Sequence, residues 1–421
     1  MRRAAGAARQ GCLAKDYASS TPTRSRSVVV VALGTSQTLA WASSYYLPAI
    51  LADPISAGIG VPSAWVFAAF SASLLIAALS GPYVGRVIDR RGGRGVLTLS
   101  SLVLAAGLLA LAAAVGPLSL FIAWAVLGIG MALGLYDAAF AALTTFYGKE
   151  AGGPITGITL FAGFASTVSW PLSSLLNHSL GWRETCLVWA AVNLLVSLPL
   201  NRFLLPLPTQ VDHLRQMPEV PVSWKPYKEM FLLAYVFAAA WFVTGSMAAH
   251  LPRLLEGAGA TTLQAVAAAA LVGPAQVAAR LAEFFILRRK HPLVSARIAT
   301  LLHPLGAAAL VFMGPSGAAI FAALYGAGNG LLTIARGTVP LAVFGPHGYG
   351  ERTGLLGAPA RAVQAFAPLG FGLLLDLMGT SVILVSSGLC LSALGALLCL
   401  RATQTSQHGG NENGTAKPLA A

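Results

Sequence analysis

The sequence predicts an all-α membrane protein with twelve transmembrane helices in two pseudo-symmetric six-helix bundles. Of its 421 residues, 56% are hydrophobic and only 10% are charged, whereas soluble domains average about 45–50% apolar and about 25% charged residues. One charged residue in ten cannot build a polar surface, which excludes a water-soluble enzyme as well as a disordered or fibrous protein. About 236 apolar residues, at about 20 for each bilayer-spanning helix, correspond to roughly twelve spans.

Twelve hydrophobic runs of spanning length follow one another along the chain. Each is too long for a strand of a transmembrane β-barrel, which has about 10 residues, and none shows the alternation of such a strand. Helices remain as the way to satisfy the backbone hydrogen bonds in lipid. The predicted spans are residues 28–52, 63–84, 95–115, 118–146, 153–177, 184–204, 229–250, 262–287, 294–313, 317–343, 353–376 and 379–401.

The basic residues lie almost entirely on one side of these spans. The chain carries 27 Lys and Arg against 14 Asp and Glu, a net charge of +13. With the N-terminus inside, 22 of the Lys and Arg fall on the cytoplasmic side, and only Arg183 and Arg253 fall outside. This positive-inside pattern predicts two cytoplasmic termini in a multi-pass protein of the cell (inner) membrane. The charge is thereby explained by topology and contact with anionic lipid, so no nucleic-acid partner is expected.

A polar segment divides the chain into two halves. Residues 205–228 contain five prolines and mixed charges between the sixth and seventh spans. We expect them to form a central cytoplasmic loop between an N-terminal six-helix bundle (28–204) and a C-terminal one (229–401). Residues 1–27 and 402–421 are expected to be cytoplasmic tails. The first has no apolar signal-peptide core, although its arginine-rich, acid-poor composition is also compatible with a cleaved transit peptide.

A short motif lies between the second and third spans. Residues 85–94 read Gly-Arg-Val-Ile-Asp-Arg-Arg-Gly-Gly-Arg, in which Gly85 and Gly92 permit tight turning and Asp89 suits a helix N-terminus or an arginine partner. The motif resembles the G-x-x-x-D-R-x-G-R loop of the major facilitator superfamily, and the resemblance covers about residues 28–401. It implies a latch that joins the two halves in the outward-facing state, formed by Gly85, Asp89, Arg90, Gly92 and Arg94.

The second half carries a weaker copy of this loop after span eight. Aligning the basic pairs Arg90-Arg91 and Arg288-Arg289 places Glu283 and Leu287 where the first copy has its glycine and aspartate. The latch is therefore expected to be one-sided.

Two comparisons within the superfamily address the solute. Span five lacks the G-P-x-x-G-G ending of proton-coupled drug antiporters, because residues 163–171 read Gly-Phe-Ala-Ser-Thr-Val-Ser-Trp-Pro. Span eight contains Gly273, Gln276 and Arg280, a spacing similar to the G-x-x-D-x-x-x-R of monocarboxylate/oxalate-type carriers. Gln276 replaces the aspartate that this resemblance associates with proton coupling, so coupling through this position is in doubt.

Five ionisable residues fall within predicted spans, where a charge is costly and indicates a functional site. Three are arginines, all in the C-terminal half, and a planar guanidinium suits a carboxylate. Polar and aromatic residues at helical spacing in spans one, eight and ten add to this set. The predicted substrate-binding residues are Arg280, Arg336, Arg361, Gln276, Tyr45, Tyr46, Trp41 and Asn329, and the proton-coupling candidates are Asp137 and Glu283.

Structural roles compete with these assignments. Arg280 could instead extend to the membrane surface or pair with Glu283, and Arg336 and Arg361 could brace neighbouring helices. Asp137 is either a proton carrier or a counter-ion of an arginine. Tyr45 and Tyr46 could belong to an interfacial aromatic belt.

No enzyme, cofactor or metal site is expected. The four cysteines (Cys12, Cys186, Cys390 and Cys399) have neither CxxC spacing nor histidine-rich surroundings, which indicates neither a disulfide framework nor a zinc site. The usual motifs of hydrolases, ATP-driven pumps and dinucleotide enzymes are missing.

These patterns together predict a secondary transporter that works by alternating access, expected to be a monomer. Its solute is expected to be a small organic anion, moved with protons or by exchange. The main alternative is an exporter of a toxic compound, either a drug or a metalloid, because residues 41–48 (Trp-Ala-Ser-Ser-Tyr-Tyr-Leu-Pro) resemble facilitators linked to arsenite efflux. A non-transporting membrane receptor is the second alternative.

Overall fold

The computed structural model describes residues 25–207 and 227–400, so the predicted tails and most of the central loop lie outside the described residues. The described chain is helical, without a strand, and the predicted all-α fold class is confirmed. Eight helical stretches are long and apolar enough to cross a membrane. One of them, Pro292–Phe344, contains two of the predicted spans, and Pro117–Ala162 contains span 118–146 and the first part of span 153–177. The series is consistent with twelve crossings.

The first half contains six successive rods, several of them broken. Its helices are α2 (Arg26–Ser43), α3 (Pro48–Ile59), α4 (Ser63–Arg91), α5 (Gly93–Ala112), α6 (Pro117–Gly134), α7 (Tyr136–Tyr147), α8 (Gly152–Ala162), α9 (Ala165–Leu180) and α10 (Trp182–Val192). Two π-helical segments, Asn193–Ser197 and Leu200–Leu204, continue the line of α10.

The second half contains longer and more regular helices. They are α12 (Tyr227–Gly257), α13 (Thr262–Ala270), α14 (Val272–Phe285), α15 (Pro292–Met313), α16 (Ala318–Phe344), α17 (Tyr349–Met378) and α18 (Val382–Cys399). Short 3-10 turns such as Leu287–Arg289 and Gly379–Ser381 connect some of them.

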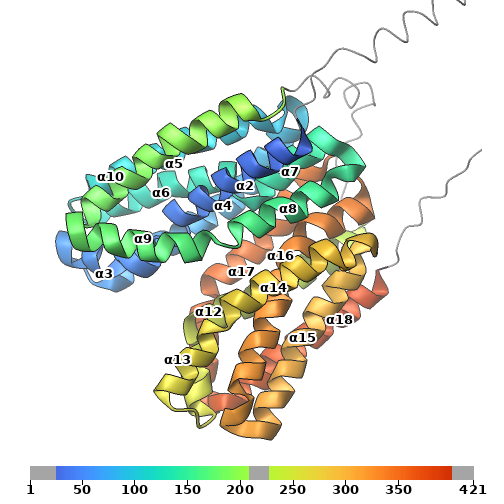
Figure 1. Cartoon of the computed structure of the whole chain (residues 1–421). Coiled ribbons are helices and arrows are strands. Elements are labelled where there is room, and N and C mark those ends of the chain that lie inside the picture. Colours follow the sequence, from blue (N-terminus) through green and yellow to red (C-terminus); the bar gives the residue numbers. More distant parts are fainter. Residues whose placement is uncertain (1–24, 208–226, 401–421) are drawn as a thin grey trace, which may run out of the picture.

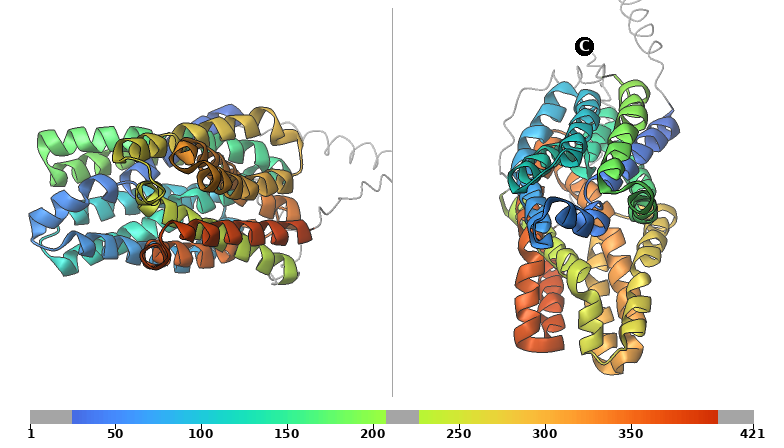
Figure 2. Two further views of the ribbon diagram at one scale, coloured as in Figure 1. Left: turned by 90° about the horizontal axis from the view of Figure 1, so that it is seen from below. Right: turned by 90° about the vertical axis from the view of Figure 1, so that its left-hand side faces the viewer.

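The two bundles meet at one end and diverge at the other (Figures 1 and 2). We call the end where the described chain begins at residue 25 and finishes at residue 400 the tail side, and the end that carries α3, α9 and α13 the far side. On the tail side α4 packs along α17, and α8 packs against α14 and α16. The bundles therefore form a V that is closed on the tail side.

Breaks in the helices of the first half occur at similar depth. The chain turns at Ser44–Leu47 between α2 and α3, adopts an extended conformation at Leu135 between α6 and α7, and loosens at Gly163 and Phe164 between α8 and α9. Discontinuous helices are the usual way in which transporter folds expose backbone and side chains to a central site. None of these breaks was anticipated from hydropathy, because the apolar residues continue through them.

The contact between α4 and α17 is made by glycines. A Cβ atom on Gly85 would overlap the Gly350 carbonyl, and one on Gly354 would lie 2.6 Å from the Gly81 carbonyl. The two backbones therefore touch directly, as small residues allow in membrane helix pairs.

The motif between α4 and α5 lies at the tail-side end of this seam. Asp89 accepts hydrogen bonds from the backbone N–H groups of Gly350 and Glu351, both at 2.9 Å, and Arg86 pairs with Glu351 at 2.6 Å. The Asp89 carboxylate thus caps the N-terminus of α17, where a negative charge is favoured.

The remaining motif residues act within the first half. Gly92 has a φ of 82°, which favours glycine, and it joins α4 to α5. Arg94 donates to the carbonyl of Arg202, and Arg90 is exposed. Of the five predicted latch residues, Gly85 and Asp89 contact the second half, at Gly350 and Glu351.

We expect Gly85→Ala to open the tail side, because the added methyl group cannot fit against Gly350 and overpacking costs about 1–3 kcal/mol. Opening is measured with a single cysteine at Thr338, a position that is 8% exposed, in a variant that lacks the native cysteines. The quantity measured is the rate at which this cysteine reacts with a hydrophilic maleimide. The rate should rise by about fivefold or more. Gly95→Ala, where a Cβ meets nothing within 4 Å, is the matched control. Equal rates in the two variants would contradict the seam.

Candidate functional site

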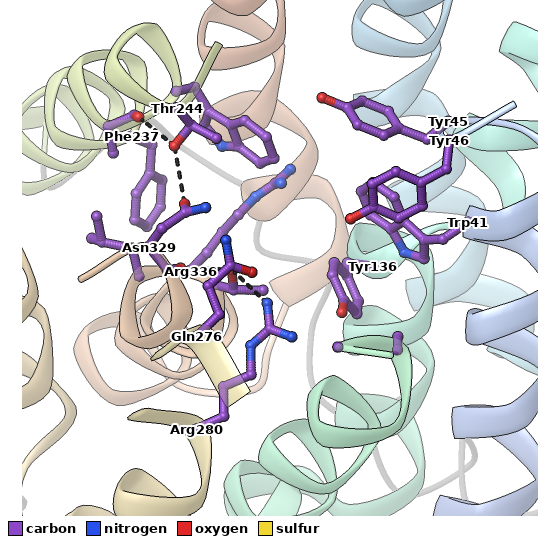
Figure 3. A pocket seen from close by; sticks show the side chains of 16 residues that line it. Trp41, Tyr45, Tyr46, Tyr136, Phe237, Thr244, Gln276, Arg280, Asn329 and Arg336 are labelled. Carbon is purple, nitrogen blue, oxygen red and sulfur yellow. Dashed lines mark hydrogen bonds between the residues drawn. The ribbon is translucent and has the colours of Figure 1, made fainter. Parts of the chain in front are cut away.

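A cavity of about 110 Å³ lies between the two bundles, at the depth of the helix breaks (Figure 3). Both halves contribute to its wall, and the contributions differ in chemistry. The first half supplies mainly aromatic rings and the second half supplies mainly polar and cationic groups. The lining residues are Trp41, Tyr45, Tyr46, Tyr136, Ala162, Gly163, Phe237, Ala240, Trp241, Thr244, Gln276, Arg280, Asn329, Leu332, Thr333 and Arg336.

The aromatic wall is a cluster of mutually packed rings. The Trp41 ring centroid lies 5.0 Å from that of Tyr45 and 4.9 Å from that of Tyr136. The break after α2 places Tyr45 and Tyr46 in the turn, with their centroids 5.4 Å apart in an edge-to-face arrangement, a geometry that stabilises aromatic pairs. The indole N–H of Trp41 is buried and has no hydrogen-bond partner, so it is free to donate to a solute.

The polar wall comes from α12, α14 and α16. Asn329 and Thr333 lie one turn apart on α16, and Asn329 accepts a hydrogen bond from the Thr244 hydroxyl at 3.0 Å. Gln276 and Arg280 lie one turn apart on α14, and Arg336 packs over the Trp241 ring at 4.9 Å. The helical spacing in the sequence therefore identified the faces of α14 and α16 that line the cavity.

Arg280 crosses from the second half to the first. Its guanidinium donates to the Thr159 carbonyl of α8 at 3.2 Å and to the Thr333 hydroxyl at 3.4 Å. No carboxylate lies within ion-pair distance of it in the described chain, its side chain is 5% exposed, and its Nε–H is unpartnered. A Cβ on Gly163 would overlap the guanidinium, so the glycine at the α8–α9 break makes room for this arginine.

Asp137 joins the other two buried arginines. Its carboxylate lies 2.5 Å from Nη2 of Arg336 and also pairs with Nη2 of Arg361. All three side chains are about nine-tenths buried. Asp137 belongs to the first turn of α7, whose free N–H groups favour a carboxylate, and Arg361 also donates to the Ala77 carbonyl of α4. The cluster therefore ties the halves together beside the cavity.

The other predicted residues lie near this cavity or apart from it. Arg361 lines a smaller adjoining void of about 20 Å³ with Gln364, which donates to the Tyr45 hydroxyl at 2.8 Å. Glu283 lies farther toward the tail side, where its carboxylate accepts from Ser295 at 2.6 Å and lines a different cavity. Glu283 and Arg280 do not pair.

Seven lining residues were not singled out from the sequence: Tyr136, Ala162, Phe237, Ala240, Trp241, Thr244 and Leu332. Tyr136 precedes Asp137 at an unanticipated helix break, and Phe237, Trp241 and Thr244 follow one face of α12 at spacings of four and three residues. That periodic face was a usable signal. Gly163 follows Thr156 and Thr159 along one face of span five, but its contact with Arg280 depends on how two distant helices approach each other and had no signal in the sequence.

No metal site emerges within the described residues. No group of three or more His, Cys, Asp or Glu side chains is placed to hold a metal ion there. Cys186 and Cys390 are buried and unpaired, Cys399 is exposed, and none of these lines the central cavity.

Comparison with known proteins adds both a family and a fold. Residues 29–368 match the Major Facilitator Superfamily. A protein of Thermoproteus tenax, described as an uncharacterized 38 kDa protein in a 23S RNA operon, is 28% identical over 343 residues, which cover 76% of this chain and 89% of that protein.

Two solved structures share the architecture. The human organic anion transporter MFSD10 (TETRAN) superposes with a TM-score of 0.70 at 19% identity, covering 90% of this chain and all of that one. The proton:xylose symporter XylE, bound to 6-bromo-6-deoxy-D-glucose, gives a TM-score of 0.67 at 13% identity, covering 89% and 95%. At these identities the likeness is one of fold.

We expect Asp137→Asn to destabilise the protein by roughly 3–5 kcal/mol, because it leaves two arginines buried without a counter-ion. Unfolding in detergent, followed by temperature or denaturant, measures this loss. Adding Arg361→Gln should recover part of the stability. Glu150→Gln, which breaks the exposed pair with Arg26, is the control and should cost under about 1 kcal/mol. Equal losses in the two single variants would contradict the role of Asp137.

Proposed function

Because the chain belongs to the major facilitator superfamily, whose members carry small solutes across membranes, we propose that the solute of this transporter is a small organic anion. The proposal concerns the central cavity. A monocarboxylate or dicarboxylate is the class of compound that its groups would bind.

One observation carries this assignment: Arg280 faces the cavity without a carboxylate partner. A buried cation with no counter-ion is costly, and a solute carboxylate would supply the missing negative charge. The unpartnered N–H groups of Arg280 and Trp41 are both donors, which require an acceptor. Three arginines and one aspartate at this depth leave an excess of positive charge, which also favours an anion.

The two walls suggest how such an anion would lie. Its carboxylate would be held by Arg280, within reach of Arg336, because a guanidinium can donate two parallel hydrogen bonds. The carbon part of the solute would contact the rings of Trp41 and Tyr136 across the cavity. A volume of about 110 Å³ suits a molecule with few heavy atoms.

Asp137 provides a means of coupling. Protonation of its carboxylate would weaken the pairs with Arg336 and Arg361, and would make Arg336 available to the solute. Proton and anion would then bind together, as in symport. In exchange transport, one anion would replace another at Arg280 while Asp137 remained ionised. Glu283, on the tail side of Arg280, would be a second proton-binding group.

We place the tail side in the cytoplasm, following the distribution of basic residues, and the protein in the cell (inner) membrane. In this orientation the seam between α4 and α17 closes the cytoplasmic side, so the described conformation faces outward. Asp89 and Gly85 would hold it by their contacts with α17. Transport would require these contacts to break as the bundles rock about the cavity.

The solved structure titled as an organic anion transporter agrees with this proposal, but its likeness is of fold alone. Export of neutral arsenite would use hydrogen bonds and would not need Arg280. The proposed anion site in the central cavity would serve import and export equally, so it does not indicate the direction of transport.

The proposal is tested with purified protein in liposomes that are loaded with candidate solutes. Exchange of radiolabelled monocarboxylates and dicarboxylates is measured, with arsenite and xylose as uncharged comparisons. We expect Arg280→Ala to lower anion exchange by about 100-fold or more, because it removes a buried charge partner worth about 3–5 kcal/mol. Arg280→Lys should retain part of the activity, since it keeps the charge and loses the planar fork.

The controls are a variant outside the site and a second arginine. Lys228→Gln, at the start of α12, should exchange normally. Unchanged anion exchange in both Arg280→Ala and Arg336→Ala would overturn the binding assignment. Arsenite transport that survives Arg280→Ala, without any anion transport in the wild type, would favour the exporter instead.

We further expect Gly163→Ala to weaken the anion site without unfolding the protein. The added methyl group overlaps the end of the Arg280 side chain and lies 3.1 Å and 3.2 Å from the carbonyl oxygens of Leu160 and Thr159. The arginine end is the group that can move, so the guanidinium leaves its position. The Michaelis constant for the anion should rise by about tenfold, as for a loss of about 1.4 kcal/mol, while the unfolding temperature changes little. Gly395→Ala on α18, where a Cβ meets nothing within 4 Å, should leave the Michaelis constant and the unfolding temperature unchanged.

A further inference from the structure

A second and larger cavity lies on the tail side of the central one. Its volume is about 660 Å³, and it lies between the start of α8 in the first half and the ends of α14, α15 and α16 in the second. Its wall includes Thr156 of α8, Glu283 of α14 and Thr338 of α16. On each of these helices, the residue lies closer to the tail side than the residues that line the central cavity. Arg280, bonded to α8 and α16, lies between the two cavities.

Basic groups from both halves surround this second cavity. Lys149 comes from the first half, and Lys290 and His291 come from the second. No carboxylate lies within 4 Å of either lysine in the described parts of the chain. The two ammonium groups are therefore available to a ligand that reaches both bundles.

His291 presents a further donor. Its Nδ1 accepts a hydrogen bond from the Leu293 N–H at 3.3 Å, so the proton of the neutral ring is on Nε2. Burial, together with Arg297, lowers the pKa of His291, which favours that neutral form. The N-terminus of α8 also meets this cavity, at Gly152 and Gly153, and N–H groups at a helix start favour anions.

The hydrogen-bond donors of the second cavity are lysines and a histidine, whereas the central cavity has arginines. This difference indicates the class of ligand. No arginine lines the second cavity in the described residues, so the fork that selects a planar carboxylate is missing. Lysine acts as a point charge and commonly binds phosphate, as do helix N-termini. Glu283 is the one acid in the wall, and its carboxylate accepts from Ser295. It would oppose an anion and so limit its affinity.

We propose that this second cavity is a regulatory site for a phosphate group, which bridges Lys149 of the first half to Lys290 and His291 of the second. The occupant is either a free phosphate compound or the headgroup of an anionic lipid. Its contacts exist only while the halves are together on the tail side. Phosphate binding therefore stabilises the closed tail side and slows the cycle, whatever solute the central cavity carries.

The test uses the full chain in nanodiscs and needs no transported solute. In one arm the discs contain phosphatidylcholine, and inorganic phosphate is titrated against chloride at equal ionic strength. In the other arm the discs contain phosphatidic acid and no free phosphate. The readouts are the unfolding temperature and the maleimide reactivity of a cysteine at Ala335, a buried position outside this cavity wall. We expect phosphate or phosphatidic acid to raise the unfolding temperature and to lower the maleimide reactivity. The arm that responds shows whether the ligand is free phosphate or a lipid headgroup.

Variants assign the effect to the cavity. In the double variant Lys149→Gln/Lys290→Gln, the apparent Kd for phosphate should rise by about tenfold, as expected for the loss of two exposed charge contacts. In the lipid arm, the amount of phosphatidic acid that gives a half-maximal response should rise by the same factor. Glu283→Gln should lower the apparent Kd by a few fold, because it removes a negative charge that repels the phosphate. Lys228→Gln/Arg289→Gln, with neither residue in the cavity wall, should change nothing.

Three results would overturn the proposal. They are no saturable response in either arm, a response that survives Lys149→Gln/Lys290→Gln, and an equal loss in Lys228→Gln/Arg289→Gln. Because the readouts are stability and accessibility, a failure here is distinct from a failure to transport carboxylates.

Discussion

The pairing of Asp137 with Arg336 and Arg361 is the constraint on which the site depends. An unpaired charge inside a membrane protein is costly, and here one carboxylate from the first half serves two arginines from the second. This fixes α7 against α16 and α17 and defines one side of the central cavity. It also consumes the acid available at this depth, so Arg280 remains without a counter-ion. The selectivity that we propose follows from this unequal division of charge.

Much of the architecture was accessible from composition and motif. The helical membrane fold and the superfamily depend on apolar length and on a short loop sequence, both of which are local properties. The twelve predicted spans are consistent with the described helices. Seven of the eight predicted substrate-binding residues line the central cavity, because charged and polar residues inside apolar helices have few other places to lie. Arg361 is the exception, and it contacts Asp137 beside the cavity instead.

What the sequence did not reveal depends on distances between helices. Hydropathy cannot indicate a break when the flanking residues are equally apolar, as at Leu135, so Tyr136 was missed. Pairing of Asp137 with two arginines, rather than with one, depends on the register of three helices. The α4–α17 contact is similar: Gly350 and Gly354 were unremarkable among 45 glycines until the packing brought them against Gly81 and Gly85.

The division of the cavity into an aromatic wall and a cationic wall has a consequence for inhibition. Each wall belongs to a different bundle, and the bundles must move past each other in the cycle. A small carboxylate could be held mainly by the arginines and travel with the second bundle. A larger molecule, with a carboxylate joined rigidly to a flat ring, would engage Arg280 and the Trp41 cluster at once. Such a molecule would tie the two bundles together and block the carrier, so arylcarboxylates are a rational starting point for its inhibitors.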